Sequence, residues 1–432
     1  MNVKMIQKKR QPSPWYQQPS CLLVLSTLVL GVIVGLSSML LALFLEVIEQ
    51  CFLHFGESAQ VPAPTGTPAL IRLLSVFAGG VIAAVIWWLL RTKTTPTVSI
   101  KSALAGEKMP FWQTMVHVLT QIFYVGTGGS IGRELAPREA GAVLAQQWSA
   151  LLERLHWTSL STEDKRLLMT AAAGAGFAGI YIAPLTGMFF SVEVLYKKFS
   201  LKTVGVSLTM ATIAMLMGAL VKGFQPYYLL NDVRFSMSSV VFVLVLAPLS
   251  GLAGGWFRKC FQWAEQHQTK NGQILWQLPL AALLTGIVAY FFPEIMGNGR
   301  ALAQFAMNSS HWDIIGVLVL GALLKVIVTV LTIRSGASGG TLTPSIAIGS
   351  ALGAVLGFFL SGWVPGMTIG QGAVLGAGTL LAASQQAPLM AMFMLIEITH
   401  LDGSAILPLA IGILIATTVS RRVLQTKTSK KD

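Results

Sequence analysis

Charged side chains are scarce in this sequence. Over 432 residues they make up 11%, against roughly 25% in soluble domains. Hydrophobic residues make up 54%, which is more apolar surface than one water-soluble core can bury. Long apolar runs recur along the whole chain, as expected where lipid is the solvent. The composition therefore excludes an ordinary soluble domain and predicts an all-α polytopic membrane protein.

Metal-ligand patterns are also missing. Cys21, Cys51 and Cys260 lack ligand-like spacing and lie in or beside apolar runs, where cysteine usually acts as a small hydrophobe. The six histidines are scattered and form no His-Glu-x-x-His motif. Paired nucleophile and base residues are lacking in the apolar runs. We predict no metal site, no cofactor and no enzymatic activity, and a membrane-embedded enzyme remains only a remote alternative.

The apolar runs predict membrane helices of different lengths. A short run at 185–195 is bounded by glycine and proline, which indicates a broken or re-entrant helix. The first run is longer than a signal-peptide core and lacks a cleavage site, so we expect it to be a retained helix. The long runs are 21–45, 69–90, 201–221, 240–257, 274–292, 314–333, 351–364 and 407–419.

Basic residues gather at the two ends of the chain, which has a net charge of +13. By the positive-inside rule, both termini are predicted to be cytoplasmic in a multi-pass protein of the cell membrane. Residues 1–20 and 421–432 are then short cytoplasmic tails. No basic stripe interleaved with exposed aromatics occurs, so we expect no nucleic-acid partner. The basic residues are Lys4, Lys8, Lys9, Arg10, Arg421, Arg422, Lys427, Lys430 and Lys431.

The two halves of the sequence resemble each other. Ala-Pro-Leu-Thr-Gly-Met-Phe at 183–189 is echoed by Ala-Pro-Leu-Met-Ala-Met-Phe at 387–393. A glutamate follows nine residues after the proline in both copies, at Glu193 and Glu397. An ancestral duplication is the simplest explanation.

A glycine-rich turn that ends in Leu-x-Pro precedes each copy, at 132–137 and 339–344. The turn proline precedes the later proline by 47 residues in the first half and by 44 in the second. We therefore predict one membrane repeat over 21–221, including a preceding helix, and a second over 222–420. Transporters built from such repeats often bind their substrate between them, near the bilayer midplane.

The chemistry of the paired turns fits an anion. A helix that begins inside the membrane leaves its first N–H groups unpartnered and has partial positive charge at its N-terminus. Glycine leaves room for an anion to approach these donors. The alternative is that these glycines serve only the close packing of helices. That alternative would not explain the prolines or Glu134.

These segments resemble the CLC family of chloride channels and transporters. Gly-Gly-Ser-Ile-Gly-Arg-Glu at 128–134 is similar to the family motif Gly-Arg-Glu-Gly-Pro, and 335–344 is similar to Ser-Gly-Ala-Pro-Gly-Gly-x-Phe-x-Pro. The alanine-rich stretch 171–185 and the later stretch 381–397 also match, in the family's order. The resemblance implies two inverted-topology repeats of tilted and broken helices, and a homodimer in a lipid bilayer.

The resemblance also implies roles for single residues. Glu134 matches the gating glutamate, which occupies an anion site when ionised and swings aside when protonated. Backbone N–H groups at Thr341, Leu342 and around Leu135 match the anion ligands. Arg133 is expected to hold the surrounding structure in place rather than to point where Glu134 points. The supporting motif residues are Gly132, Arg133, Pro137, Gly339, Gly340, Pro344 and Glu193.

The sequence departs from the family at several places. Leu135-Ala136-Pro137 stands where the family has Gly-Pro after the gate, and Leu342 replaces the phenylalanine of the second turn. The Gly-Ser-Gly-Ile-Pro motif is absent, and Thr95 aligns with its anion-coordinating serine. Glu193 is followed by Val194 where the family has its proton-transfer glutamate, and no tyrosine follows Tyr290. We expect transport of a chloride-like halide, with proton coupling left open. Fluoride/proton exchange for fluoride export is the alternative.

One further polar pair lies before the first turn. His117 and Gln121 are one helical turn apart. They are expected either to line a vestibule or to form hydrogen-bonded contacts between helices.

Overall fold

The chain is almost entirely helical in the computed structural model, which describes residues 18–157, 160–360 and 362–426. No β-strand occurs in these ranges, which confirms the all-α prediction. The α-helices are α1 (Pro19–Leu53), α2 (Ala69–Lys93), α3 (Ile100–Leu104), α4 (Phe111–Gly126), α5 (Leu135–Arg154), α6 (Thr162–Tyr181), α7 (Pro184–Phe189), α8 (Leu201–Lys222), α9 (Ser238–Gln266), α10 (Ile274–Phe291), α11 (Arg300–Met307), α12 (Ile315–Arg334), α13 (Leu342–Leu360), α14 (Ile369–Gln385), α15 (Pro388–Thr399) and α16 (Ile406–Gln425).

Shorter helical turns join some of these elements. A π-helix, Phe190–Tyr196, continues α7. The 3-10 helices are Pro293–Ile295, Trp312–Ile314 and Gly403–Ala405. Most of the two predicted tails, including Lys4, Lys8, Lys9, Arg10, Lys427, Lys430 and Lys431, lies outside the described residues.

Eight helices of the described part are long and apolar enough to cross a membrane. They confirm the predicted apolar runs, and the chain is a multi-pass membrane protein. Three helices extend well beyond their runs. The helix α1 ends at Leu53 rather than near 45, α9 ends at Gln266 rather than near 257, and α13 begins at Leu342 rather than near 351. Hydrophobicity missed the first turns of α13 because Thr343, Pro344 and Ser345 interrupt the apolar pattern.

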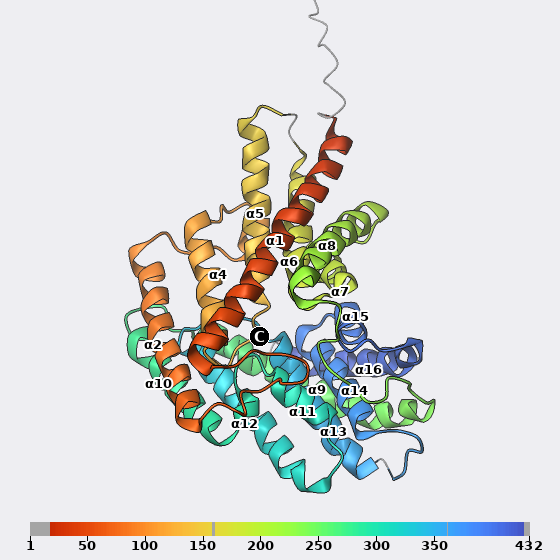
Figure 1. Cartoon of the computed structure of the whole chain (residues 1–432). Coiled ribbons are helices and arrows are strands. Elements are labelled where there is room, and N and C mark those ends of the chain that lie inside the picture. The colour runs from red at the N-terminus through yellow and green to blue at the C-terminus, as the bar shows by residue number, and fades with distance from the viewer. Residues whose placement is uncertain (1–17, 158–159, 361, 427–432) are drawn as a thin grey trace, which may run out of the picture.

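The two halves of the chain lie largely apart and meet along a few helices (Figure 1). The helices α1, α4, α5, α6 and α8 form one group, and α9 and α11 to α16 form the other. Contacts between the halves join α2 to α10 and α7 to α15. The predicted boundary between the repeats, at 221/222, falls at the end of α8, and the extents of the repeats stay a prediction.

The short helices α7 and α15 begin in the same way. Ile182 and Gln386 adopt left-handed backbone conformations with φ of 55° and 56°. Ala183 and Ala387 then share φ −133° and ψ 79°. A proline follows at the first helical position in each copy, where its missing N–H is not needed. The broken helix predicted at 185–195 is therefore confirmed.

A glutamate from each half caps the short helix of the other half. The Glu397 carboxylate accepts hydrogen bonds from the backbone N–H groups of Leu185 and Thr186, both at 2.8 Å. In the same way, Glu193 accepts from Leu389 at 3.1 Å and Met390 at 2.8 Å. A carboxylate at a helix N-terminus satisfies unpartnered donors and interacts favourably with the helix dipole.

The exchange of caps places equivalent aromatic rings against each other. Phe189 of α7 stacks on Phe393 of α15 with ring centroids 4.7 Å apart and planes 15° apart. Each phenylalanine lies five residues after the proline of its copy. Contacts between equivalent residues are what a pseudo-two-fold axis between the halves would produce.

Glycines allow the helices beside each turn to approach closely. A Cβ atom at Gly141 of α5 would collide with the carbonyl oxygen of Ala172 on α6. In the second half, a Cβ atom at Gly349 of α13 would collide with the carbonyl oxygen of Gly376 on α14. Small residues at such contacts are typical of membrane helices.

Candidate functional site

The two glycine-rich turns lie against each other in the middle of the protein. Gly132 and Gly340 exchange two backbone hydrogen bonds of 2.8 Å and form the only bridge of this kind in the described part of the chain. The turns lead directly into α5 at Leu135 and into α13 at Leu342. Two helix N-termini, each with unpartnered N–H groups, therefore begin beside each other.

The Glu134 side chain lies between these N-termini. It is fully buried, and its Oε1 atom accepts a hydrogen bond of 2.6 Å from the backbone N–H of Leu342. Its carboxylate contacts Gly132 and Gly340 so closely that a Cβ atom at either position would collide with it. Glu134 precedes α5, yet its carboxylate binds the first N–H group of α13. A negatively charged group from one half thus occupies the donor site of the other half.

The structure brings most of the predicted site residues together at this point. Leu135 is the first residue of α5, and Gly339 packs on Ile131. Pro137 and Pro344 each lie in the first turn of their helix, where proline removes no helical hydrogen bond. The Thr341 hydroxyl accepts a hydrogen bond of 3.3 Å from the Gln385 amide.

Thr95 lies apart from this group. It is exposed in the segment between α2 and α3. Among the described residues, the Thr95 carbonyl oxygen accepts a hydrogen bond of 3.4 Å from the Thr94 hydroxyl. The structure therefore gives Thr95 no contact with either turn, and its predicted role in anion binding stays a prediction.

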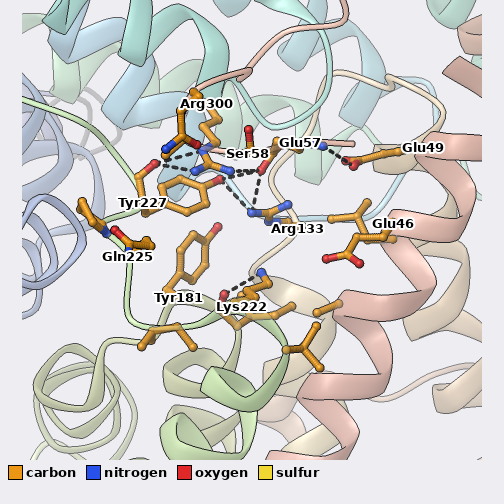
Figure 2. Close-up of a pocket in the computed structure, with 18 residues that line it drawn as sticks. Glu46, Glu49, Glu57, Ser58, Arg133, Tyr181, Lys222, Gln225, Tyr227 and Arg300 are labelled. Carbon is orange, nitrogen blue, oxygen red and sulfur yellow. Dashed lines mark hydrogen bonds and ion pairs between the residues drawn. The ribbon is translucent and has the colours of Figure 1, made fainter. Parts of the chain in front are cut away.

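Arg133 points into a network of charged residues (Figure 2). Its Nη2 atom lies 3.0 Å from Glu57 Oε1 and donates to the Tyr227 hydroxyl at 2.9 Å. Arg300 lies 2.8 Å from the same Glu57 oxygen and donates to the Tyr227 carbonyl oxygen. These contacts fix the residue next to Glu134 in the chain, as the sequence predicted for Arg133.

Glu57 is the acidic centre of this network. Burial alone would raise the pKa of its carboxyl, but the guanidinium groups of Arg133 and Arg300 outweigh burial and lower the pKa to about 2. A buried carboxylate held by two arginines stays ionised over the whole physiological range. The network is therefore a permanent support for the first turn.

Two cavities border the turns, one beside each turn. The first has a volume of about 280 Å³ and is lined by Arg133, Tyr181, Lys222 and residues of α1 (Figure 2). The second, of about 170 Å³, lies between the last turns of α9 and Thr341. Each cavity is lined by one residue of a turn, and neither is lined by Glu134, which is fully buried.

A fully buried lysine supports the loop that carries Glu134. The Lys325 amine of α12 donates to the Ser130 hydroxyl at 2.9 Å, to the Ile295 carbonyl oxygen at 2.9 Å and to the Gly297 carbonyl oxygen at 2.7 Å. Three acceptors match the three N–H donors of an ammonium group. Lys325 thus joins the loop before Glu134 to the loop that precedes α11.

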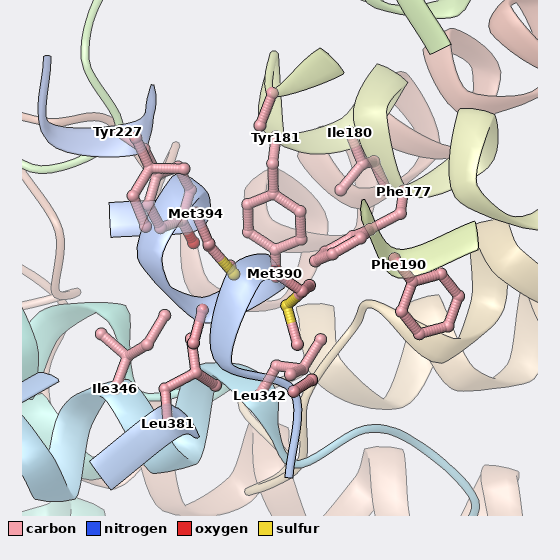
Figure 3. Close-up of a cluster of buried hydrophobic side chains, with 14 of the residues drawn as sticks. Phe177, Ile180, Tyr181, Phe190, Tyr227, Leu342, Ile346, Leu381, Met390 and Met394 are labelled. Carbon is pink, nitrogen blue, oxygen red and sulfur yellow. The ribbon is translucent and has the colours of Figure 1, made fainter. Parts of the chain in front are cut away.

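Apolar side chains from both halves enclose the other side of the site (Figure 3). Tyr181 lies among them, and its hydroxyl is 2.9 Å from the Thr343 hydroxyl of α13. Two members of this cluster, Ile180 and Tyr181, also line the first cavity. The members of the cluster include Phe177, Ile180, Phe190, Leu342, Ile346, Leu381, Met390 and Met394.

Sequence reasoning missed Glu57, Arg300 and Lys325. Lys325 had a usable signal, because it is the only charged residue inside the apolar run 314–333 and such residues mark functional sites. Glu57 and Arg300 lie in or beside loops and carry no such signal.

Comparison with known proteins supports the geometry. A family model described as voltage gated chloride channel matches residues 79–421. The chain belongs to this family, the CLC family. The ClcB voltage-gated chloride channel of Citrobacter koseri is 29% identical over 391 residues, which cover 87% of this chain and 90% of that protein. ClcB of Salmonella typhi is 26% identical over 415 residues, which cover 92% and 95% of the two chains.

Solved structures show the same CLC fold. A slow cyanobacterial Cl⁻/H⁺ antiporter aligns with a TM-score of 0.77 and 22% identity, over 95% of this chain and 98% of that one. A CLC-type fluoride/proton antiporter aligns with a TM-score of 0.64 and 23% identity, over 94% and 97% of the two chains.

Proposed function

We propose that this CLC protein moves chloride-like halides across a bacterial cell membrane through a pathway gated by Glu134. The observation that carries the proposal is the hydrogen bond from Leu342 N–H to the Glu134 carboxylate. The carboxylate occupies a donor site that an anion could use, so the two compete for the same N–H group. Protonation removes the negative charge and with it most of the advantage of the carboxylate in this competition.

Fluoride export by fluoride/proton exchange is a second candidate. The missing Gly-Ser-Gly-Ile-Pro motif and the presence of Val194 after Glu193 are the departures from the family pattern that support it. A fluoride/proton antiporter also shares the fold. Thr95, Leu135, Thr341 and Leu342 are proposed as anion ligands in either case.

The assembly and orientation are further parts of the proposal. Family resemblance supports a homodimer with one pathway per subunit and proton coupling of the transport. Arg421 and Arg422 follow the apolar part of α16, which supports a cytoplasmic C-terminus. An even number of crossings would then place the N-terminus on the same side.

The decisive experiment is anion flux from vesicles that contain the purified protein. We expect wild-type flux to rise as the pH falls, and Glu134→Gln and Glu134→Ala to give flux that no longer depends on pH. Vesicles loaded with chloride or with fluoride separate the two candidate ions. Unchanged pH dependence in Glu134→Ala would rule out the gating role, and failure of the wild type to pass either ion would rule out transport.

A further inference from the structure

A second buried carboxyl group lies on the helix that begins at the gate. Glu139 follows Glu134 by five residues, which corresponds to a rise of about 7.5 Å along α5. From the gate, α5 runs toward the end of the molecule where α1 begins (Figure 1), which the proposed orientation makes cytoplasmic. Glu139 is buried among His117 and Gln121 of α4 and Trp87 of α2. None of these residues has a role in the gate itself.

Trp87 fixes the protonation state of His117. The Trp87 indole N–H donates to His117 Nδ1 at 3.0 Å. Indole nitrogen is a donor only, so Nδ1 must accept and the ring proton lies on Nε2. A doubly protonated imidazole would place two donors face to face. His117 is therefore neutral and turns its Nε2–H toward Glu139 Oε2, which is 3.5 Å away.

Glu139 is bound only by neutral side chains. The Gln121 amide donates to Glu139 Oε2 at 2.7 Å, and His117 Nε2 lies 3.5 Å from the same oxygen. Arg138 attracts Glu139 electrostatically but forms no direct ion pair with it among the described residues, since its guanidinium binds the Glu134 carbonyl oxygen. Arg91 binds Thr269 and Ser338. A buried carboxylate without a direct ion pair is costly, so this environment favours uptake of a proton.

The cluster can also hold the protonated form. The Gln121 Oε1 atom is buried and has no hydrogen-bond partner among the described residues. A carboxylic acid at Glu139 could donate its proton to this oxygen, while the amide N–H donors stabilise the carboxylate. The polar side chains therefore fit both protonation states of Glu139.

Glu193 is not suited to the same task. Both of its oxygens accept hydrogen bonds from backbone N–H groups at the start of α15. These N–H groups can donate to a carboxylate but cannot accept a proton from a carboxylic acid. Protonation of Glu193 would uncap that helix. Glu193 is thus a structural residue, although it lies next to the position where the family has its proton-transfer glutamate.

We propose that Glu139 is the second proton-binding carboxyl of the transport cycle, which passes protons between the cytoplasmic side and Glu134. A proton leaves the Glu139 carboxyl, whose carboxylate is then held by Gln121 and His117. It binds the Glu134 carboxylate, which gives up its hydrogen bond to Leu342. This inference rests on the proposed gated transport and names the group that couples it to protons.

The test measures anion and proton flux together in vesicles. We expect Glu139→Gln to lower the number of protons moved per anion at least tenfold while anion flux continues, and Glu139→Asp to restore part of it. Glu193→Gln serves as the matched control and should keep the wild-type ratio. The assignment would be overturned if Glu139→Gln left the number of protons moved per anion unchanged. It would also be overturned if that number fell in Glu193→Gln alone.

A second variant guards against misfolding of Glu139→Gln. Trp87→Phe removes the donor at His117 Nδ1, so His117 can take a second proton and pair with an ionised Glu139. We expect the proton-to-anion ratio to fall in this variant as well. Anion flux without proton movement in the wild type would overturn this inference and leave anion transport standing. Absence of anion flux in the wild type would overturn both.

Discussion

The carboxylate of Glu134 and the backbone N–H of Leu342 form a 2.6 Å hydrogen bond between residues 208 positions apart in the chain. The bond joins the turn of one half to the first N–H group of a helix in the other half. When the carboxylate leaves, the Leu342 N–H becomes free to bind an anion. Opening of the gate and binding of the anion are therefore the replacement of one acceptor by another at the same donor.

Gly340→Ala should obstruct the site that Glu134 and an anion share. The added Cβ atom would collide with Glu134 Oε1 and displace the carboxylate from Leu342. Loss of a hydrogen bond to a charged group is worth about 1.5–3 kcal/mol, which is roughly tenfold or more in an equilibrium constant. Because the methyl group stands where an anion would bind, anion flux at neutral pH should fall even though the carboxylate is displaced. Gly316→Ala, where the new atom meets nothing within 4 Å, should leave the flux unchanged.

Glu57→Gln should destabilise the protein at neutral pH. It leaves Arg133 and Arg300 without their shared carboxylate, and breaking a buried ion pair costs about 3–5 kcal/mol. Thermal unfolding in detergent measures the loss. A melting temperature equal to that of the wild type would show that the network does not support the fold.

The contribution of Glu57 should also depend on pH. Its folded pKa of about 2 lies below the ordinary value of 4.5. The stabilisation is therefore complete above pH 4.5 and is lost as the pH falls toward 2. The difference in melting temperature between wild type and Glu57→Gln should stay constant from pH 7 to pH 5 and shrink below 4.5. A difference that already shrinks near pH 6 would contradict the assignment.

Lys325→Met should weaken anion binding. The variant removes the hydrogen bond to Ser130 in the loop before Glu134 and the two hydrogen bonds to Ile295 and Gly297. The loop loses its support, so the halide concentration needed for half-saturation should rise. Lys101→Met changes an exposed lysine of α3 and should leave that concentration unchanged.

The exchanged caps should contribute about equally to stability. Glu193→Gln and Glu397→Gln each replace a charged acceptor of two helix N–H groups, and such a cap is worth about 1 kcal/mol or more. We expect similar drops in melting temperature for the two variants. A large loss in one variant and none in the other would contradict the symmetric role of the caps.

The sequence revealed the position of the site but few of its contacts. The repeated turns, the prolines and Glu134 could be found because local backbone requirements leave a pattern of glycine and proline. The choice of hydrogen-bond partner for Glu134 depends on how the halves pack, and no local pattern records that packing. His117 and Gln121 were predicted to line a vestibule or to bridge helices, and their contacts with Trp87 and Glu139 confirm the second reading.

The exchange of glutamate caps also bears on how the protein is made. The helix that begins at Pro184 leaves the ribosome 213 residues before its cap, Glu397, is synthesised. Until then, its first N–H groups have no carboxylate in a membrane that offers no water. The first half is therefore expected to stay incomplete until the second half is inserted, so the chain should resist division into two separately folding halves.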